Sequence, residues 1–185
     1  MPPVLVFVTV GTDHHPFDRV IDWIDDWAER QEPHVRAFVQ RGTSHAPRIA
    51  GSAEYVSHEE MEHLMETANA VVCHGGPGTI FDCLHAGLKP IVVPRRHSLG
   101  EHVDDHQVRF ATHMGGLGFV AVADSEPRLH ALLEQAIAGA PEFRAAPTED
   151  RLIETSSRFG SLVETILGIH PPEDGRGAAA TDKTV

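Results

Sequence analysis

The sequence lacks several features that define other classes of protein. It has only two cysteines, Cys73 and Cys83, which are too few for a disulfide framework, and we expect both to fill the core of a protein in a reducing cytoplasm. No apolar run approaches the roughly 20 residues of a membrane-spanning helix. Residues 1–8 show neither the basic leader nor the cleavage site of a secretory signal. These absences favour a cytoplasmic protein.

Clusters of basic residues and metal motifs are missing as well. The chain has 15 Lys and Arg against 27 Asp and Glu, a formal net charge of −12, so nucleic acid and a bare anionic membrane are poor direct partners. There are 14 histidines, and His102 and His106 are four residues apart. Neither an H-E-x-x-H motif nor a cysteine pair with zinc spacing is present, and we therefore predict no metal site.

What the chain does contain is an alternation of short apolar runs and amphipathic segments, which is typical of βαβ units. The predicted strands cover residues 4–10, 35–40, 54–56, 70–73, 91–93 and 117–122. The predicted helices cover residues 17–30, 79–86, 103–112, 126–138 and 148–167, with a further helix after a capping box at Ser57 and Glu60. The predicted fold is a single Rossmann-like α/β domain with a doubly wound parallel sheet over residues 1–168. A disordered tail is predicted over residues 169–185.

The turn between the strand at 70–73 and the next helix is the most informative segment. Residues 74–79 read H-G-G-P-G-T. The glycines let the backbone approach a phosphate, and the amides of a first helical turn point at it. Thr79 and His74 can donate to the same diphosphate, while Asp82 can accept from a ribose diol. The turn is neither G-x-G-x-x-G nor G-x-x-x-x-G-K-[ST], so dinucleotide and P-loop sites lose their specific support.

The order of these residues resembles the donor-binding signature of GT-B glycosyltransferases. After H-G-G-x-G-T come Asp82, Gly87, Pro94, Asp105-His106-Gln107 and Ala111. In that family a histidine and a hydroxyl residue hold the diphosphate, an acidic residue holds the ribose, and a D-x-Q pair contacts the sugar and nucleotide. The resemblance assigns donor binding to His74, Gly75, Gly76, Gly78, Thr79, Asp82, Asp105 and Gln107. Asp82 departs from the family pattern, in which Glu is commoner.

The resemblance extends toward the N-terminus and covers about residues 4–140. Residues 7–12, which read F-V-T-V-G-T, are similar to the start of Alg13-type subunits, and in particular to the small subunits of bacterial two-component exopolysaccharide glycosyltransferases. By this resemblance Gly11 and Thr12 belong to the donor site. Val56 lies in a segment similar to the one whose backbone reads uracil in the peptidoglycan N-acetylglucosaminyltransferase.

A GT-B enzyme has two α/β domains that face each other across a cleft, and this chain resembles only the donor domain. The resemblance therefore implies a UDP-sugar as substrate, no cofactor, and an Alg14-like membrane-anchored partner that binds a lipid-linked saccharide acceptor. It also implies recruitment to the inner face of the membrane and metal-free displacement at the anomeric carbon. The base would come from the partner, or from His14 or His15 in the loop after the first strand.

Two other functions fit the same residues. The chain can be a noncatalytic regulatory module that binds a UDP-sugar, or a self-sufficient glycosyltransferase acting as a homodimer. Arg95 and Arg96 leave a smaller choice open, because they either bind a charged donor sugar such as a uronic acid or lie in a solvated loop.

Overall fold

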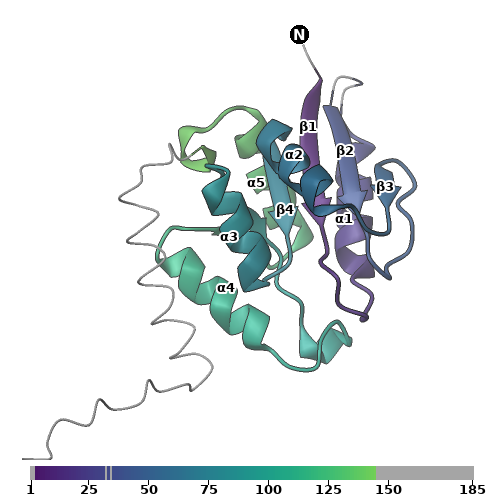
Figure 1. Ribbon diagram of the computed structural model, residues 1–185, viewed down its shortest axis with the longest axis vertical. Coiled ribbons are helices and arrows are strands. Elements are labelled where there is room, and N and C mark those ends of the chain that lie inside the picture. Colours follow the sequence, from purple (N-terminus) through teal and green to yellow (C-terminus); the bar gives the residue numbers. More distant parts are fainter. Residues whose placement is uncertain (1–2, 32, 34, 145–185) are drawn as a thin grey trace, which may run out of the picture. The chain divides into compact units, whose positions relative to one another are not determined.

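The computed structural model describes residues 3–31, 33 and 35–144 of the 185-residue chain. Strands and helices alternate along this part (Figure 1). The strands are β1 (Val4–Thr9), β2 (Val35–Gln40), β3 (Gly51–Ala53), β4 (Ala70–Cys73), β5 (Ile91–Val92) and β6 (Ala121–Val122). The helices are α1 (Asp18–Ala28), α2 (His58–Thr67), α3 (Pro77–His85), α4 (His106–Gly116) and α5 (Glu126–Ile137), with short 3-10 turns η1 (His97–Leu99) and η2 (Pro141–Phe143).

All six strands form one sheet in the order β3-β2-β1-β4-β5-β6, and every pairing in it is parallel. The chain moves outward in one direction from β1 to β3 and in the other direction from β4 to β6. This is a doubly wound sheet, and it confirms the predicted Rossmann-like α/β fold.

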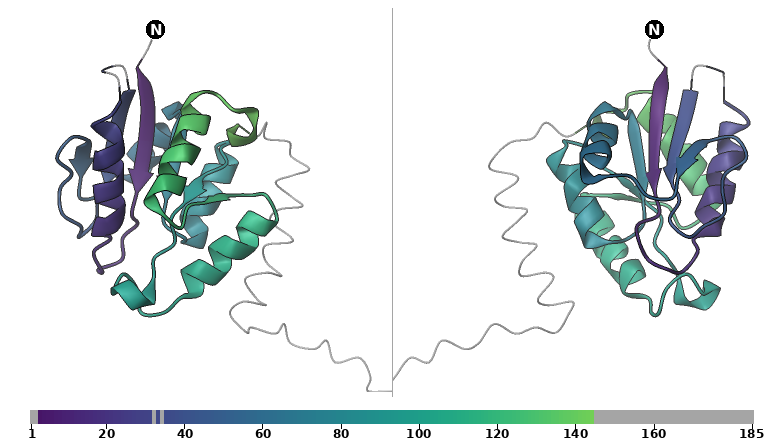
Figure 2. Two further views of the ribbon diagram at one scale, coloured as in Figure 1. Left: turned by 180° about the vertical axis from the view of Figure 1, so that it is seen from behind. Right: turned by 45° about the vertical axis from the view of Figure 1, so that its right-hand side comes forward.

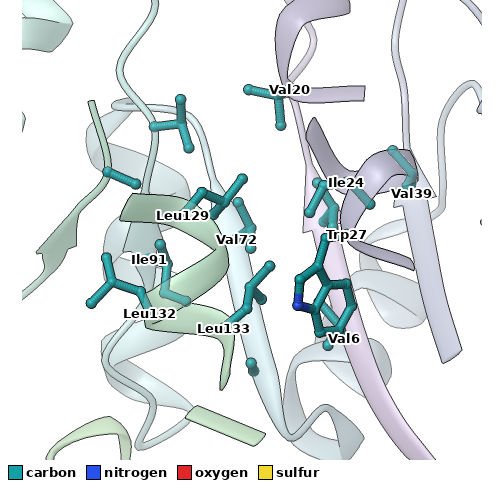
Figure 3. Close-up of a cluster of buried hydrophobic side chains, with 14 of the residues drawn as sticks. Val6, Val20, Ile24, Trp27, Val39, Val72, Ile91, Leu129, Leu132 and Leu133 are labelled. Carbon is teal, nitrogen blue, oxygen red and sulfur yellow. The ribbon is translucent and has the colours of Figure 1, made fainter. Parts of the chain in front are cut away.

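Helices cover both faces of the sheet, which explains why the central strands β1 and β4 are apolar except for Thr9. On one face α1 and α5 pack over the sheet (Figure 2), and side chains such as Trp27, Leu129 and Leu133 meet Val72 of β4 (Figure 3). On the other face α2 and α3 cover a smaller cluster that includes Met65. Both cysteines are buried and unbridged, as predicted.

Several boundaries differ from the predicted ones. The third strand is β3 at residues 51–53 rather than 54–56, and α4 begins at His106 rather than at Val103. That helix then continues through Gly115 and Gly116, so β6 is reduced to two residues at the end of the predicted strand 117–122. The capping box at Ser57 and Glu60 is confirmed.

The predicted helix 148–167 and the predicted tail over residues 169–185 lie outside the described residues, as does the end of the predicted domain. Within the described ranges, no helix combines the length and apolar character needed to cross a membrane.

Candidate nucleotide-binding site

The site predicted from the sequence lies between β1 and β4, where the direction in which the chain adds strands to the sheet reverses. β1 and β4 are neighbours in the sheet, with Thr9 opposite Cys73 at their carboxyl ends. The chain leaves β1 toward one side of the sheet and leaves β4 toward the other, and such a switch point opens a crevice beyond the strand ends. Gly11 lies two residues beyond the end of β1 and His74 directly follows β4, so the structure brings together two segments that are 63 residues apart.

The turn after β4 presents free backbone amides at the N-terminus of α3. Gly76 is the N-cap of this helix and Pro77 is its first residue, and no side chain caps it. Among the described residues we find no acceptor for the amides of Gly76, Gly78 and Thr79. The Gly75 amide differs, because it donates to Oε1 of Gln107 at 3.1 Å. Three amides, aided by the helix dipole, are therefore available to an anion.

The His74 ring fills the space between Gly11 and Gly76. A Cβ on Gly11, which has a φ of +80°, would lie 2.6 Å from Cε1 of His74, and a Cβ on Gly76 would overlap Nε2 of the same ring. Nδ1 of His74 is buried without a hydrogen-bond partner. Burial and the nearby positive charge of Arg95 lower the pKa of His74 to about 4. The imidazole is therefore neutral at neutral pH and can offer a ligand a hydrogen bond but not a charge.

Gln107 and Asp105 hold the backbone of the site together. Oε1 of the buried Gln107 accepts from the amides of Gly75 (3.1 Å) and Arg95 (3.3 Å), and so joins the loops that follow β4 and β5. The exposed Asp105 accepts from the amide of His97 at 2.9 Å. These structural roles were not foreseen in the sequence, and the predicted sugar contacts of both side chains stay predictions.

Asp82 lies on the exposed side of α3, in a shallow hollow between α2 and α3. The hollow is also lined by Glu62, Glu66 and His85. Val56 lies just ahead of α2 and is half-buried, whereas Thr12 is exposed beside Gly11. The acidic hollow repels phosphate, but its carboxylates can accept hydrogen bonds from hydroxyl groups.

The two histidines predicted as candidate bases lie in the loop after β1, beside Asp13. His15 contacts the carboxylate of Asp13 through its amide (2.8 Å) and its Nδ1 (2.6 Å). His14 is exposed, and its Nδ1 lies 3.8 Å from the same carboxylate. Burial raises the pKa of Asp13, but the hydrogen bonds from His15 and the charges of Arg95 and His102 bring it down to about 2. A carboxylate that stays ionised can orient the His15 ring.

Arg95 has a different role from both of those considered in the sequence. It is only 1% exposed, so it does not lie in a solvated loop, and its guanidinium is turned inward. The guanidinium donates to backbone carbonyls of Val10 (2.8 Å), His15 (2.6 Å) and Glu101 (2.9 Å). Nη1 makes two of these bonds and Nη2 makes one, while Nε is buried without a partner among the described residues. The guanidinium thus faces the protein interior, where it supports the loop after β1.

Comparison with known proteins decides the family. The family model of the glycosyltransferase family 28 C-terminal domain matches residues 5–160, which is most of the chain. The chain belongs to this family. Family membership supports a glycosyltransferase domain that binds a nucleotide sugar.

Individual relatives agree with that membership. The chain is 30% identical over 118 residues to the UDP-N-acetylglucosamine–N-acetylmuramyl-(pentapeptide) pyrophosphoryl-undecaprenol N-acetylglucosamine transferase of Pseudomonas fluorescens (strain SBW25). This match covers 64% of the chain but only 29% of that enzyme.

Solved structures share the fold at lower identity. The solution structure of ALG13 superposes with a TM-score of 0.57 at 19% identity, over 89% of this chain and 97% of that one. Acinetobacter baumannii MurG gives 0.54 at 16% identity, over 90% of this chain and 50% of that one. The kitacinnamycin glycosyltransferase gives 0.59 at 18% identity, over 88% and 43%. The chain thus corresponds in fold to about half of the MurG and kitacinnamycin glycosyltransferase chains and to nearly all of the ALG13 chain.

Proposed function

We propose that this chain is the UDP-sugar-binding part of a hexosyltransferase and that it needs an acceptor-binding partner for transfer. The observation that carries the proposal is the set of three free amides at Gly76, Gly78 and Thr79, which lie at a helix N-terminus and a sheet switch point. Such amides suit a diphosphate, which is the leaving group when an acceptor hydroxyl displaces the nucleotide at the anomeric carbon.

We assign the other parts of the donor to the side chains around these amides. Thr79 adds a hydroxyl donor beside the amides, and neutral His74 adds a hydrogen bond through whichever ring nitrogen faces the diphosphate. The hollow at Asp82 suits the hydroxyl groups of the ribose better than it suits phosphate, because its other carboxylates are Glu62 and Glu66. We assign the contact with the base to Val56, which precedes α2.

We assign acceptor binding to a partner protein, whereas the base that activates the acceptor hydroxyl has two possible sources. A membrane-anchored, Alg14-like partner at the inner face of the membrane would hold a lipid-linked saccharide. His15 is the better of the two local base candidates, because Asp13 holds its Nδ1 at 2.6 Å while His14 projects into solvent. If the partner supplies the base instead, His15→Gln will leave the transfer rate nearly unchanged.

The proposal is tested by a sugar-transfer assay with the purified chain, with a co-expressed partner, and with both together. We expect transfer only from the pair. UDP binding to the chain alone is measured in parallel by calorimetry, with His74→Ala and Thr79→Ala as site variants and His113→Ala, on the exposed side of α4, as a control. Turnover by the chain alone would favour the homodimer alternative. Binding without transfer by the pair would favour a regulatory module, and absence of UDP binding would refute the proposal.

A further inference from the structure

The segment before α4 and the loop after β1 bring a cluster of imidazoles and carboxylates together outside the predicted diphosphate cradle. Ring nitrogens of His102 and His106 and a carboxylate oxygen of Asp104 lie within 4.8 Å of one another. Asp13, which comes from β1's loop 91 residues before Asp104, adds a second carboxylate against the outer side of His102. The three neighbouring residues do not form one of the common zinc motifs, and Asp13 comes from a distant segment, so the cluster becomes apparent only in the fold.

We propose that His102, Asp104 and His106 bind a divalent transition metal ion of the zinc type, through Nδ1 of each histidine and a carboxylate oxygen of Asp104. Two imidazoles and one carboxylate form an established ligand set for zinc, and they leave a position open for water or an anion. Nδ1 of His106 lies 2.5 Å and Nδ1 of His102 lies 3.7 Å from Oδ1 of Asp104. Neighbouring ligands of a tetrahedral zinc are roughly 3.3 Å apart. Metal binding would therefore replace the hydrogen bond between His106 and Asp104 and the one that His102 accepts from the Asp104 amide.

The other ring nitrogen of His102 faces the carboxylate of Asp13. Its Nε2 lies 3.3 Å from Oδ2 of Asp13, while its Nδ1 accepts from the Asp104 amide at 3.4 Å. A histidine that accepts at Nδ1 carries its proton at Nε2, and a histidine that binds metal commonly donates its free N–H to a carboxylate. Asp13 is itself fixed by two contacts from His15. His102 is therefore oriented for metal binding by a carboxylate outside the ligand set.

A competing ligand set shares Asp13 but uses His14 and His15. We favour the first set, because the His14 side chain is 82% exposed. The His102 side chain, by contrast, is only 12% exposed. We infer that His14 is not a ligand, which gives the experiment a matched control from the same cluster.

Metal binding is measured on the whole chain after treatment with a chelator, by zinc titration calorimetry and by the visible absorption of bound Co²⁺. We expect one equivalent of zinc and tetrahedral Co²⁺ absorption. His102→Gln and His106→Gln should each abolish both signals, and Asp13→Asn should weaken zinc binding roughly 10- to 100-fold, as for other partners of metal ligands. His14→Gln and His113→Gln should bind zinc like the original chain.

A second measurement guards against variants that simply fold poorly. Zinc should raise the unfolding temperature of the original chain and of His14→Gln relative to a chelator, and should have no effect on His106→Gln. The proposal is overturned if the chain binds no zinc saturably, if His102→Gln and His106→Gln retain binding, or if His14→Gln loses it. None of these outcomes depends on UDP binding, which is titrated in separate samples.

Discussion

At the scale of single residues, the close packing of His74 against Gly76 gives the most direct test of the site's geometry. A Cβ on Gly76 would overlap the His74 ring, whereas a Cβ on Gly78 would meet nothing within 4 Å. We expect Gly76→Ala to lower the free energy of unfolding by about 1–3 kcal/mol, as other overpacked substitutions do, and to weaken UDP binding. Gly78→Ala should leave the free energy of unfolding unchanged or slightly higher.

Urea denaturation of the two glycine variants makes this comparison. The same Gly76→Ala change in a His74→Ala background should be much less costly, because the ring that the new methyl group meets is gone. Equal costs in the two backgrounds would show that His74 does not fill this space.

The protonation of His74 gives a second prediction at this scale. Its pKa is about 4 in the fold against an ordinary value of 6.5, so between these values the unfolded chain binds the extra proton and the folded chain does not. Stability contributed by the neutral ring is therefore fully present above pH 6.5 and is lost as the pH falls toward 4. From pH 7.5 to 4.5 we expect the original chain to lose about 2–3 kcal/mol more than His74→Gln. Parallel losses in the two proteins would contradict a buried, neutral His74.

At the scale of elements, Gln107 connects α4 to the turns after β4 and β5. Gln107→Leu leaves the amides of Gly75 and Arg95 without an acceptor, which should cost about 2–4 kcal/mol of unfolding free energy. Gln135→Leu, on the exposed side of α5, should change stability by no more than about 0.5 kcal/mol. Urea denaturation measures both variants. A loss for Gln107→Leu no larger than that of the control would show that the two hydrogen bonds contribute nothing.

Elements that are defined by local patterns could be predicted from the sequence. The strands β1, β2 and β4 are recognisable from their apolar runs, and the start of α2 is recognisable from its capping box. The start of α4 could not be predicted, because the carboxylates of Asp104 and Asp105 bind the backbone amides of His106 and His97. Such side-chain bonds compete with helical ones and hold the segment before His106 in turns.

At the scale of the whole molecule, the alternating order of strands and helices along the sequence predicts the topology of the sheet. It does not predict the side-chain contacts between segments that are distant in the sequence. A glycine-rich turn between a strand and a helix predicts an anion site by itself, and the sheet places it at the switch point. The buried position of Arg95 depends on carbonyls from β1's loop, and the pairing of His102 with Asp13 joins segments 89 residues apart. No local pattern encodes these partners, so the sequence leaves the support of the site undetermined.

We expect the amides at the start of α3 to bind the diphosphate of a UDP-sugar. The most direct measurement is a titration of the ¹⁵N-labelled chain with UDP, followed by amide NMR. We predict saturable shifts of the Gly76, Gly78 and Thr79 amides, with little change at Gly116 and Gly118 at the far end of α4. Absence of saturable shifts, or shifts confined to residues away from the β4–α3 turn, would contradict the account.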